Sequence, residues 1–222
     1  MLTADEQADF LRAVDAVKQT ALQHLSSNGD PTFAIHFVSN LHRGVDQVVQ
    51  SAQDQGLKTD CKSGCSHCCH YRVEALAPEV FRISNALRKL PPGHIEEIIA
   101  GLLKHAASVK GVSVVDYHFQ CPFLSDHLCS IYDVRPAVCR KAHSSDVEKC
   151  KLTGTDIPGS LEVAMKSEAL IRGTADAYHQ VKLSASGHYE LGQAVLLALT
   201  DETAESRWYG GESVFNGPSD LP

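Results

Sequence analysis

The sequence predicts a mostly α-helical protein in which a helical domain surrounds an irregular, metal-organised cysteine-rich segment. Apolar residues recur every three or four positions through both ends of the chain, which is the period of amphipathic helices. All eight cysteines fall within residues 61–150. With 222 residues, 43% of them hydrophobic and 21% charged, the chain can bury a core without disulfides. We therefore expect a single domain over residues 1–222.

The N-terminal part, residues 1–58, is predicted to be a helical hairpin. Apolar residues between 10 and 25 lie at helical spacing, and the turn-forming stretch SSNGDP at 26–31 ends this helix. A second apolar stripe runs from Ala34 to Ala52. Two helices joined by a short link are typical of an αα-hairpin.

The middle part, residues 59–152, is predicted to be the metal-binding region. A helix is expected to begin near Pro78 and to end at the Pro91-Pro92-Gly93 stop, because proline suits the first turn of a helix and disrupts its interior. Another helix is expected over 94–110. Residues 111–129 predict a short strand or an irregular loop.

The C-terminal part, residues 153–222, is predicted to contain helices and a tail. A long helix is expected after Ser160 as N-cap, with Gly187 beyond its C-terminus, and another from 191 to 199. The aromatic residues of the tail, Trp208, Tyr209 and Phe215, are expected to pack on the body while the end frays.

The cysteines form two groups, and their clustering favours shared ligation over scattered roles in the core. The first group lies in the stretch CKSGCSHCCH and the second some fifty residues later. Thiolates bind zinc and also hold iron–sulfur clusters, and the spacing fits neither a zinc ribbon nor a bacterial ferredoxin. The cofactor is therefore zinc or an iron–sulfur cluster. The predicted metal ligands are Cys61, Cys65, Cys68, Cys69, Cys121, Cys129 and Cys139, and Cys150 is left without a role.

The first open question about this site is whether the adjacent residues Cys68 and Cys69 both bind one ion. Cys68 and Cys69 diverge in an extended chain and lie about 100° apart in a helix, so both need not bind one ion. Imidazoles are alternative zinc ligands, which leaves His67, His70 and His143 as candidates, although each is more often a surface or hydrogen-bonding residue.

Charged and turn-forming residues around the second group are expected to support the site. Arg135, Arg140 and Lys141 can offset thiolate charge, since four thiolates around one zinc ion leave a net charge of −2. Pro136 is expected to open a helix that carries Cys139, and Ser130-x-x-Asp133 resembles a capping box.

These residues resemble the YkgJ-like cysteine-cluster family, which is described as a zinc- or iron-chelating domain. The resemblance covers residues 59–150. It consists of Cys61-x3-Cys65-x2-Cys68-Cys69, Cys121-Pro122-Phe123-Leu124, and Cys129-Ser130-Ile131-Tyr132-Asp133-x-Arg135-Pro136-x2-Cys139-Arg140. It implies a metal or iron–sulfur site built from these cysteines. The same family type includes the flagellin lysine methylase, an iron–sulfur protein, but this chain is shorter and shows no glycine-rich cofactor loop, so methyl transfer is not carried over.

Three functions follow as alternatives. The first is a metal-binding protein whose segment 59–150 loses order without its metal. The second is an iron–sulfur enzyme, either a redox protein or a protein-modifying enzyme, which the number of cysteines favours. The third is a thiol redox sensor, which needs exposed cysteines of low pKa beside a resolving partner. No hydrolase or nucleotide-binding motif is present.

The net charge and the hydropathy of the chain indicate which binding partners and which cellular compartment to expect. The net charge of −7 is not that of a nucleic-acid-binding protein, and no apolar run reaches the ~20 residues of a membrane span. The N-terminal residues do not resemble a signal peptide, so a cytoplasmic location is expected, where cysteines persist as thiols or metal ligands rather than as disulfides. The expected partner is thus a metal ion or cluster. The sequence names no protein partner.

Overall fold

A computed structural model describes residues 3–152, 157–183 and 189–215 of the chain. The protein is mostly α-helical, which confirms the predicted fold class. The chain divides into two compact units, each made of two separate segments. The first unit comprises Met1–Ser63 and Ala137–Lys182, and the second comprises Gly64–Pro136 and Leu183–Pro222.

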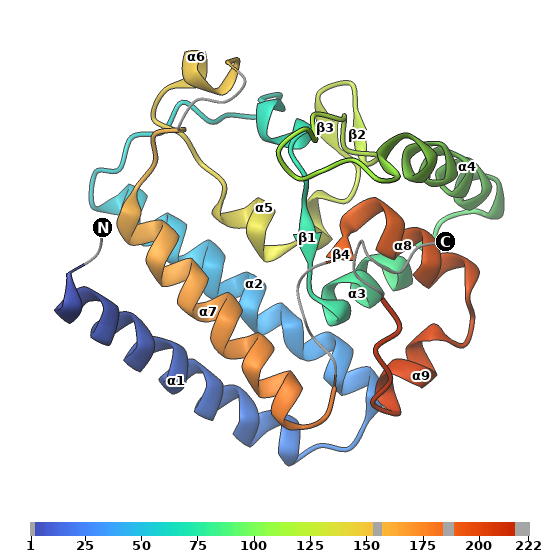
Figure 1. Cartoon of the computed structure of the whole chain (residues 1–222), viewed down its shortest axis with the longest axis horizontal. Helices are drawn as coiled ribbons and strands as arrows, with labels where there is room; N and C mark the ends of the chain where they lie inside the picture. The colour runs from blue at the N-terminus through green and yellow to red at the C-terminus, as the bar shows by residue number, and fades with distance from the viewer. Residues whose placement is uncertain (1–2, 153–156, 184–188, 216–222) are drawn as a thin grey trace. The chain divides into compact units, whose positions relative to one another are not determined.

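Three long helices build the first unit. They are α1 (Ala4–Ser26), α2 (Pro31–Asp54) and α7 (Leu161–Gln180), and α7 packs against both of the others. In Figure 1 α7 runs between α1 and α2. Both N-terminal helices are present as predicted, and Ser160 caps α7 as predicted by accepting the Val163 N–H at 3.2 Å. The partner that separates the two N-terminal helices comes from more than a hundred residues later in the chain.

Close contacts fix α7 in this position. A Cβ at Gly173 would lie 2.5 Å from the Val14 carbonyl oxygen and 2.7 Å from Val17 Cβ, so only glycine lets α7 approach α1 this closely. On the other side, the fully buried Tyr178 donates its hydroxyl to the Ala34 carbonyl of α2 at 2.6 Å. The core of the first unit lies along these two faces.

Two short helices complete the first unit. The helix α5 (Ala137–Lys141) follows Pro136, as predicted, and packs against α2 and α7. The other, α6 (Val147–Cys150), is capped by Asp146.

Four helices build the second unit: α3 (Ala77–Leu87), α4 (Pro92–Val109), α8 (Leu191–Thr200) and α9 (Ala204–Tyr209). The helix α8 packs against α3, α4 and α9. At the centre of the unit, the Phe81 ring lies 5.3 Å from the Trp208 ring and 5.1 Å from the Phe215 ring. The predicted docking is confirmed for Trp208 and Phe215, while Tyr209 is only half-buried; Gly187 and residues 216–222 lie outside the described residues.

Two details of the second unit differ from the sequence prediction. The helix α3 ends at Leu87 and is followed by a turn, a few residues before the predicted stop. Pro92 begins α4 rather than only ending α3, because the first turn of a helix needs no N–H from proline and suits its fixed φ.

Short strands and 3₁₀-turns connect the helices of the second unit. The strand β1 (Glu74–Ala75) pairs antiparallel with β4 (Tyr189–Glu190), and β2 (Leu124–Ser125) pairs with β3 (Leu128–Cys129). The 3₁₀-helices are η1 (His67–His70) and η2 (Tyr132–Val134). Residues 111–129, predicted to form a short strand or an irregular loop, therefore contain both kinds of structure. Within the part of the chain that the structure describes, no helix combines the length and apolar character needed to cross a bilayer.

Candidate metal centre

The eight cysteines divide between the two units, and none is part of a disulfide. The first unit holds Cys61, Cys139 and Cys150, and the second holds Cys65, Cys68, Cys69, Cys121 and Cys129. Five of the seven predicted ligands thus lie in one compact unit.

A β-hairpin positions the two cysteines of the second group that lie in this unit. Asp126 and His127 join β2 to β3, and both have positive φ, 48° and 63°, which is the conformation of a two-residue type I′ turn. The register pairs Leu124 with Cys129, and the Leu124 N–H donates to the Cys121 carbonyl at 3.0 Å. Cys121 and Cys129 are consequently held at the open end of the hairpin.

Apolar anchors fix this end of the hairpin to the core. Phe123 and Ile131, each two residues after a cysteine, are 3% and 4% exposed. Ser130, predicted to form a capping box with Asp133, instead bonds the Phe123 carbonyl through both its backbone N–H at 2.8 Å and its hydroxyl at 3.0 Å. This pairing closes the hairpin, so the predicted capping box is wrong.

The first cysteine group reaches the hairpin through η1. The four residues of η1 include Cys68 and Cys69, and the Cys69 N–H donates to the Ser66 carbonyl at 3.0 Å. The Cys121 N–H donates to the Cys69 carbonyl at 2.7 Å. A backbone hydrogen bond therefore joins the two cysteine groups directly at Cys69 and Cys121.

The thiols of the second unit raise one another's pKa values. A hydrogen bond with the Cys69 side chain, with desolvation and the Cys69 charge adding to it, raises the pKa of Cys68 far above its usual range. Burial, together with the charges of Cys129, Glu190 and Cys68, raises the pKa of Cys121 to about 11. Burial and the Cys68 charge also raise the pKa of Cys129. Four thiols are thus close enough to interact electrostatically.

Other groups favour the thiolate form at the same place. The Phe123 N–H bonds Cys121 and the Ile131 N–H bonds Cys129, and each of these hydrogen bonds lowers the pKa of the thiol that accepts it. The guanidinium of Arg135 lowers the pKa values of Cys68 and Cys129. Arg135 lies 3.7 Å above the Tyr132 ring and donates to the Tyr132 carbonyl at 2.9 Å. The predicted role of Arg135 in offsetting thiolate charge therefore agrees with its position.

The donor set fits zinc or an iron–sulfur cluster, since soft thiolates with N–H···S bonds and a nearby cation are what both require. Within residues 3–152, 157–183 and 189–215, no three histidine, cysteine, aspartate or glutamate side chains are spaced as the ligands of one ion. Cys68, Cys69, Cys121 and Cys129 are linked by the interactions that shift their pKa values.

The remaining cysteines have separate surroundings in the first unit. Cys61 Sγ accepts the Ser144 N–H at 3.3 Å. Cys150 Sγ lies 3.5 Å from the Asp146 carbonyl, one turn earlier in α6. Cys139 lies on α5 beside Arg140 and Lys141, but these two cations pair with carboxylates of the first unit.

The partners of those two cations come from the long helices. Arg140 contacts Asp46 of α2 at 2.6 Å, and Lys141 contacts Glu168 of α7 at 2.7 Å. Both contacts tie α5 to its neighbours. Arg140 and Lys141 are predicted to offset thiolate charge, and in the structure each pairs with a carboxylate.

Of the three candidate histidines, His67 is the first residue of η1, and the other two differ in their hydrogen bonding. His143 Nε2 accepts the Ser160 N–H at 2.8 Å, and Nδ1 lies 2.8 Å from the Lys141 carbonyl, so both ring nitrogens are engaged. His70 Nδ1 lies 3.2 Å from the Ser66 carbonyl. An imidazole that donates Nδ1–H to a carbonyl leaves Nε2 for a metal, which favours His70 over His143 as an alternative ligand.

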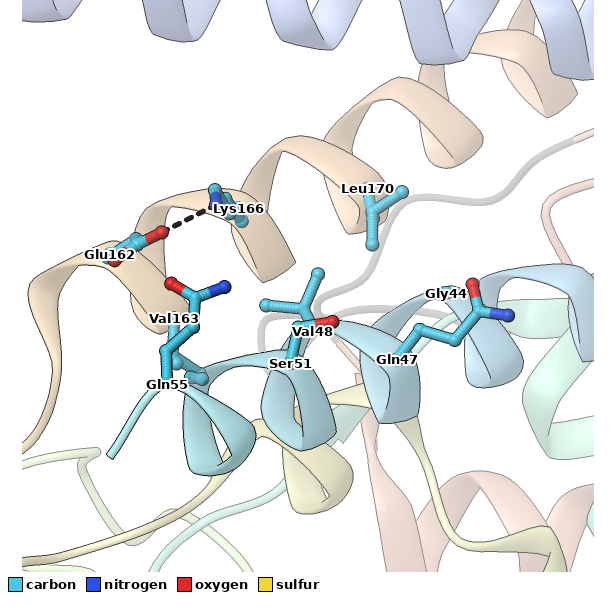
Figure 2. A pocket seen from close by; sticks show the side chains of 10 residues that line it. Gly44, Gln47, Val48, Ser51, Gln55, Glu162, Val163, Lys166 and Leu170 are labelled. Atoms are coloured by element: carbon cyan, nitrogen blue, oxygen red, sulfur yellow. Dashed lines mark hydrogen bonds and ion pairs between the residues drawn. The ribbon is translucent and has the colours of Figure 1, made fainter. Parts of the chain in front are cut away.

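A surface pocket of the first unit is unrelated to the thiols. It has a volume of about 280 Å³ and lies between α2 and α7, with Val48, Val163 and Leu170 among its apolar lining. Figure 2 shows the Glu162–Lys166 ion pair at its edge and Gln47, Ser51 and Gln55 along α2. Its lining contains no cysteine or histidine, so the pocket is not a metal site of the predicted kind.

One group near the thiols was missed by sequence reasoning. Glu190, the N-cap of α8, raises the pKa of Cys121 although it lies some seventy residues later in the chain. No motif links the two positions, and only the pairing of β1 with β4 brings Glu190 into this unit's interior.

Comparison with known families bears on the same segment. Residues 60–156 match the CxxCxxCC family. The family is described as a "putative zinc- or iron-chelating domain", and the match confirms the resemblance found in the sequence. No curated protein and no solved structure is significantly similar to the chain. The CxxCxxCC segment contains all eight cysteines and contributes to both units.

Proposed function

We propose that the protein binds zinc or an iron–sulfur cluster through its cysteines, with Cys68, Cys69, Cys121 and Cys129 as the ligands of the second unit. The observation that carries the proposal is the convergence of these four thiols from segments fifty residues apart. Cys61, Cys65 and Cys139 remain candidate ligands because their spacing resembles that of the CxxCxxCC family.

The electrostatics of the four thiols support this function. Without a cation, a hydrogen bond with Cys69 raises the pKa of Cys68, burial raises the pKa values of Cys121 and Cys129, and the charges of neighbouring thiols add to each rise. A bound cation removes this penalty, and the thiolates then benefit from the N–H groups of Phe123 and Ile131 and from Arg135. Metal binding therefore releases protons and strengthens as the pH rises.

The same chemistry supports a reducing compartment. Zinc and iron–sulfur clusters bind thiolates, and oxidation of the cysteines to disulfides would remove the ligands. The proposal thus includes a cytoplasmic location.

Anaerobic purification followed by metal and sulfide analysis tests the proposal. Stoichiometric zinc in a colourless protein identifies a zinc site, and iron with acid-labile sulfide and broad visible absorption identifies a cluster. An iron–sulfur result would keep the enzyme alternative open. A preparation with neither metal nor sulfide, and without affinity for added zinc or for cluster reconstitution, would contradict the proposal.

A matched pair of variants tests the ligand assignment. Cys129→Ser removes a thiol of the proposed set, whereas Cys150→Ser removes a thiol that contacts the carbonyl of Asp146, the N-cap of α6. We expect Cys129→Ser to lose the metal and Cys150→Ser to retain it. Equal metal content in the two variants would refute the assignment of Cys129.

A further inference from the structure

A buried triangle of polar side chains lies in the second unit, and one of its corners is the Glu190 carboxylate that acts on Cys121. Its corners are His105 on α4, Tyr117 in the following loop and Glu190 at the start of α8. His105 Nε2 lies 3.1 Å from Glu190 Oε1, and the Tyr117 hydroxyl lies 3.2 Å from each of these two atoms. The three residues are 8%, 5% and 4% exposed, so water does not solvate this group freely.

Two protons are available for the three short contacts of the triangle. Glu190 is ionised, because bonds from His105 and from backbone N–H groups of α8 outweigh burial and lower its pKa. His105 can place one proton on Nε2, and Tyr117 carries one. If both protons point to Glu190 Oε1, the contact between Tyr117 and His105 contains no hydrogen. A cation bound to all three atoms would take the place of these two protons.

The size of the triangle matches a set of metal ligands. Ligands about 2.0–2.1 Å from a metal ion lie about 3.0 Å apart in octahedral geometry and about 3.3 Å apart in tetrahedral geometry. The three observed edges of 3.1–3.2 Å fall between these values. A metal ion could therefore contact all three atoms with little movement of the side chains.

The surroundings hold two corners of the triangle in place. The second oxygen of Glu190 accepts the Gln193 N–H at 2.8 Å, which fixes the carboxylate at the α8 N-terminus. A Cβ at Gly192 would lie 2.5 Å from His105 Cδ2, so the glycine gives the imidazole ring its space. The donor atoms are thus preorganised by elements that also form the core.

We infer that His105, Tyr117 and Glu190 form a second metal site, which binds a transition-metal cation that prefers nitrogen and oxygen donors, with iron as the best match. The carboxylate and a phenolate supply two negative charges, which balance a divalent cation and offset most of the charge of a trivalent one. On binding, Tyr117 releases its phenolic proton to solvent, and His105 carries its proton on Nδ1 so that Nε2 can ligate. The site would select a different ion from the thiols, because soft thiolates and hard oxygen donors prefer different metals.

Ferric iron is the best probe, because phenolate bound to Fe(III) produces a charge-transfer colour that thiolate-bound zinc does not. The full chain is first saturated with zinc at its cysteines and then titrated with ferric nitrilotriacetate. We expect one iron per chain and a visible band whose resonance Raman spectrum shows phenolate modes. Absence of both from the wild-type protein overturns the inference, whatever metal the cysteines hold.

Variants assign the band to this triangle. Tyr117→Phe is expected to abolish the colour while leaving the zinc content unchanged, and Tyr132→Phe, at a tyrosine that is 60% exposed, is expected to keep both. His105→Gln and Glu190→Gln retain hydrogen-bonding groups and serve as a second test if Tyr117→Phe does not fold. We expect each to weaken iron binding at least tenfold. A band that persists in folded Tyr117→Phe, or iron affinity unchanged in both glutamine variants, overturns the inference.

Discussion

The raised pKa of Cys121 makes this thiol resistant to modification if the metal-free second unit keeps its fold. A rise from the ordinary value of 9.0 to about 11 lowers the fraction of thiolate about a hundredfold at pH 8, and the thiolate is the form that reacts. After metal removal with a chelator under reducing conditions, Cys121 should therefore react with iodoacetamide about a hundredfold more slowly than in the unfolded chain. Its rate should increase about tenfold per pH unit up to roughly pH 11.

The same pKa shift makes a prediction about stability. Because the pKa of Cys121 is higher in the folded state than in the unfolded state, its contribution is fully present below pH 9 and is lost as the pH rises from about 9 to 11. A difference of two pKa units corresponds to about 3 kcal/mol. The free energy of unfolding of the metal-free protein should thus fall by an amount of this order over that range, and Cys121→Ser should lose part of the dependence.

Mass spectrometry of the peptide that contains Cys121 measures the alkylation rate, and urea unfolding followed by circular dichroism measures the stability. The chain unfolded in guanidinium is the reference for the rate. Reaction of native, metal-free Cys121 at the rate of the unfolded chain at pH 8 would refute the argument that burial and neighbouring thiols suppress its ionisation. Metal-loaded protein is the second control, in which the thiol should be protected by ligation.

Three further substitutions, with Gly101→Ala on α4 of the second unit as a control, test the packing of the first unit and the role of His143. In urea unfolding, Gly173→Ala should destabilise the protein by about 1–3 kcal/mol, because the added Cβ would meet the backbone of α1. Gly101→Ala, where no atom lies within 4 Å of the added Cβ, should be neutral or stabilising by about 1 kcal/mol. Tyr178→Phe leaves the buried Ala34 carbonyl without its side-chain donor and should cost about 1–2 kcal/mol in the same assay. His143→Ala removes the acceptor of the Ser160 N–H and should lower stability by about 1–2 kcal/mol without changing metal content, and loss of metal would show that His143 is a ligand.

Local periodicity explains why most helices could be predicted from the sequence. The stripes that predict α1, α2 and α7 are the faces that pack in the first unit, and a helix reveals its buried face through spacing alone. Spacing does not reveal which helices meet. The position of α7 between α1 and α2 depends on the close approach at Gly173, and a single glycine in a helix gives no indication of its partner.

The cysteine site was predictable in composition but not in arrangement. The clustering of thiols indicates ligation, and the structure joins Cys69 to Cys121 as a long-range site requires. The sequence could not show that Cys61 and Cys139 fall in a different compact unit from the other predicted ligands, because unit boundaries follow from packing of distant segments. It also could not show Glu190 beside the thiols, since no motif connects them.

The adjacent pair Cys68 and Cys69 poses the sharpest question about the thiol site, and the local backbone helps to answer it. In a regular α-helix the two side chains would diverge by about 100°. In the short η1 turn the two side chains hydrogen-bond to each other, and Cys68 also interacts with Cys121 and Cys129. Both sulfurs of the pair are therefore placed with the second group. A four-thiol site can then form within the second unit without a thiol from the first, and the metal content of Cys65→Ser tests whether the fifth thiol of this unit is a ligand.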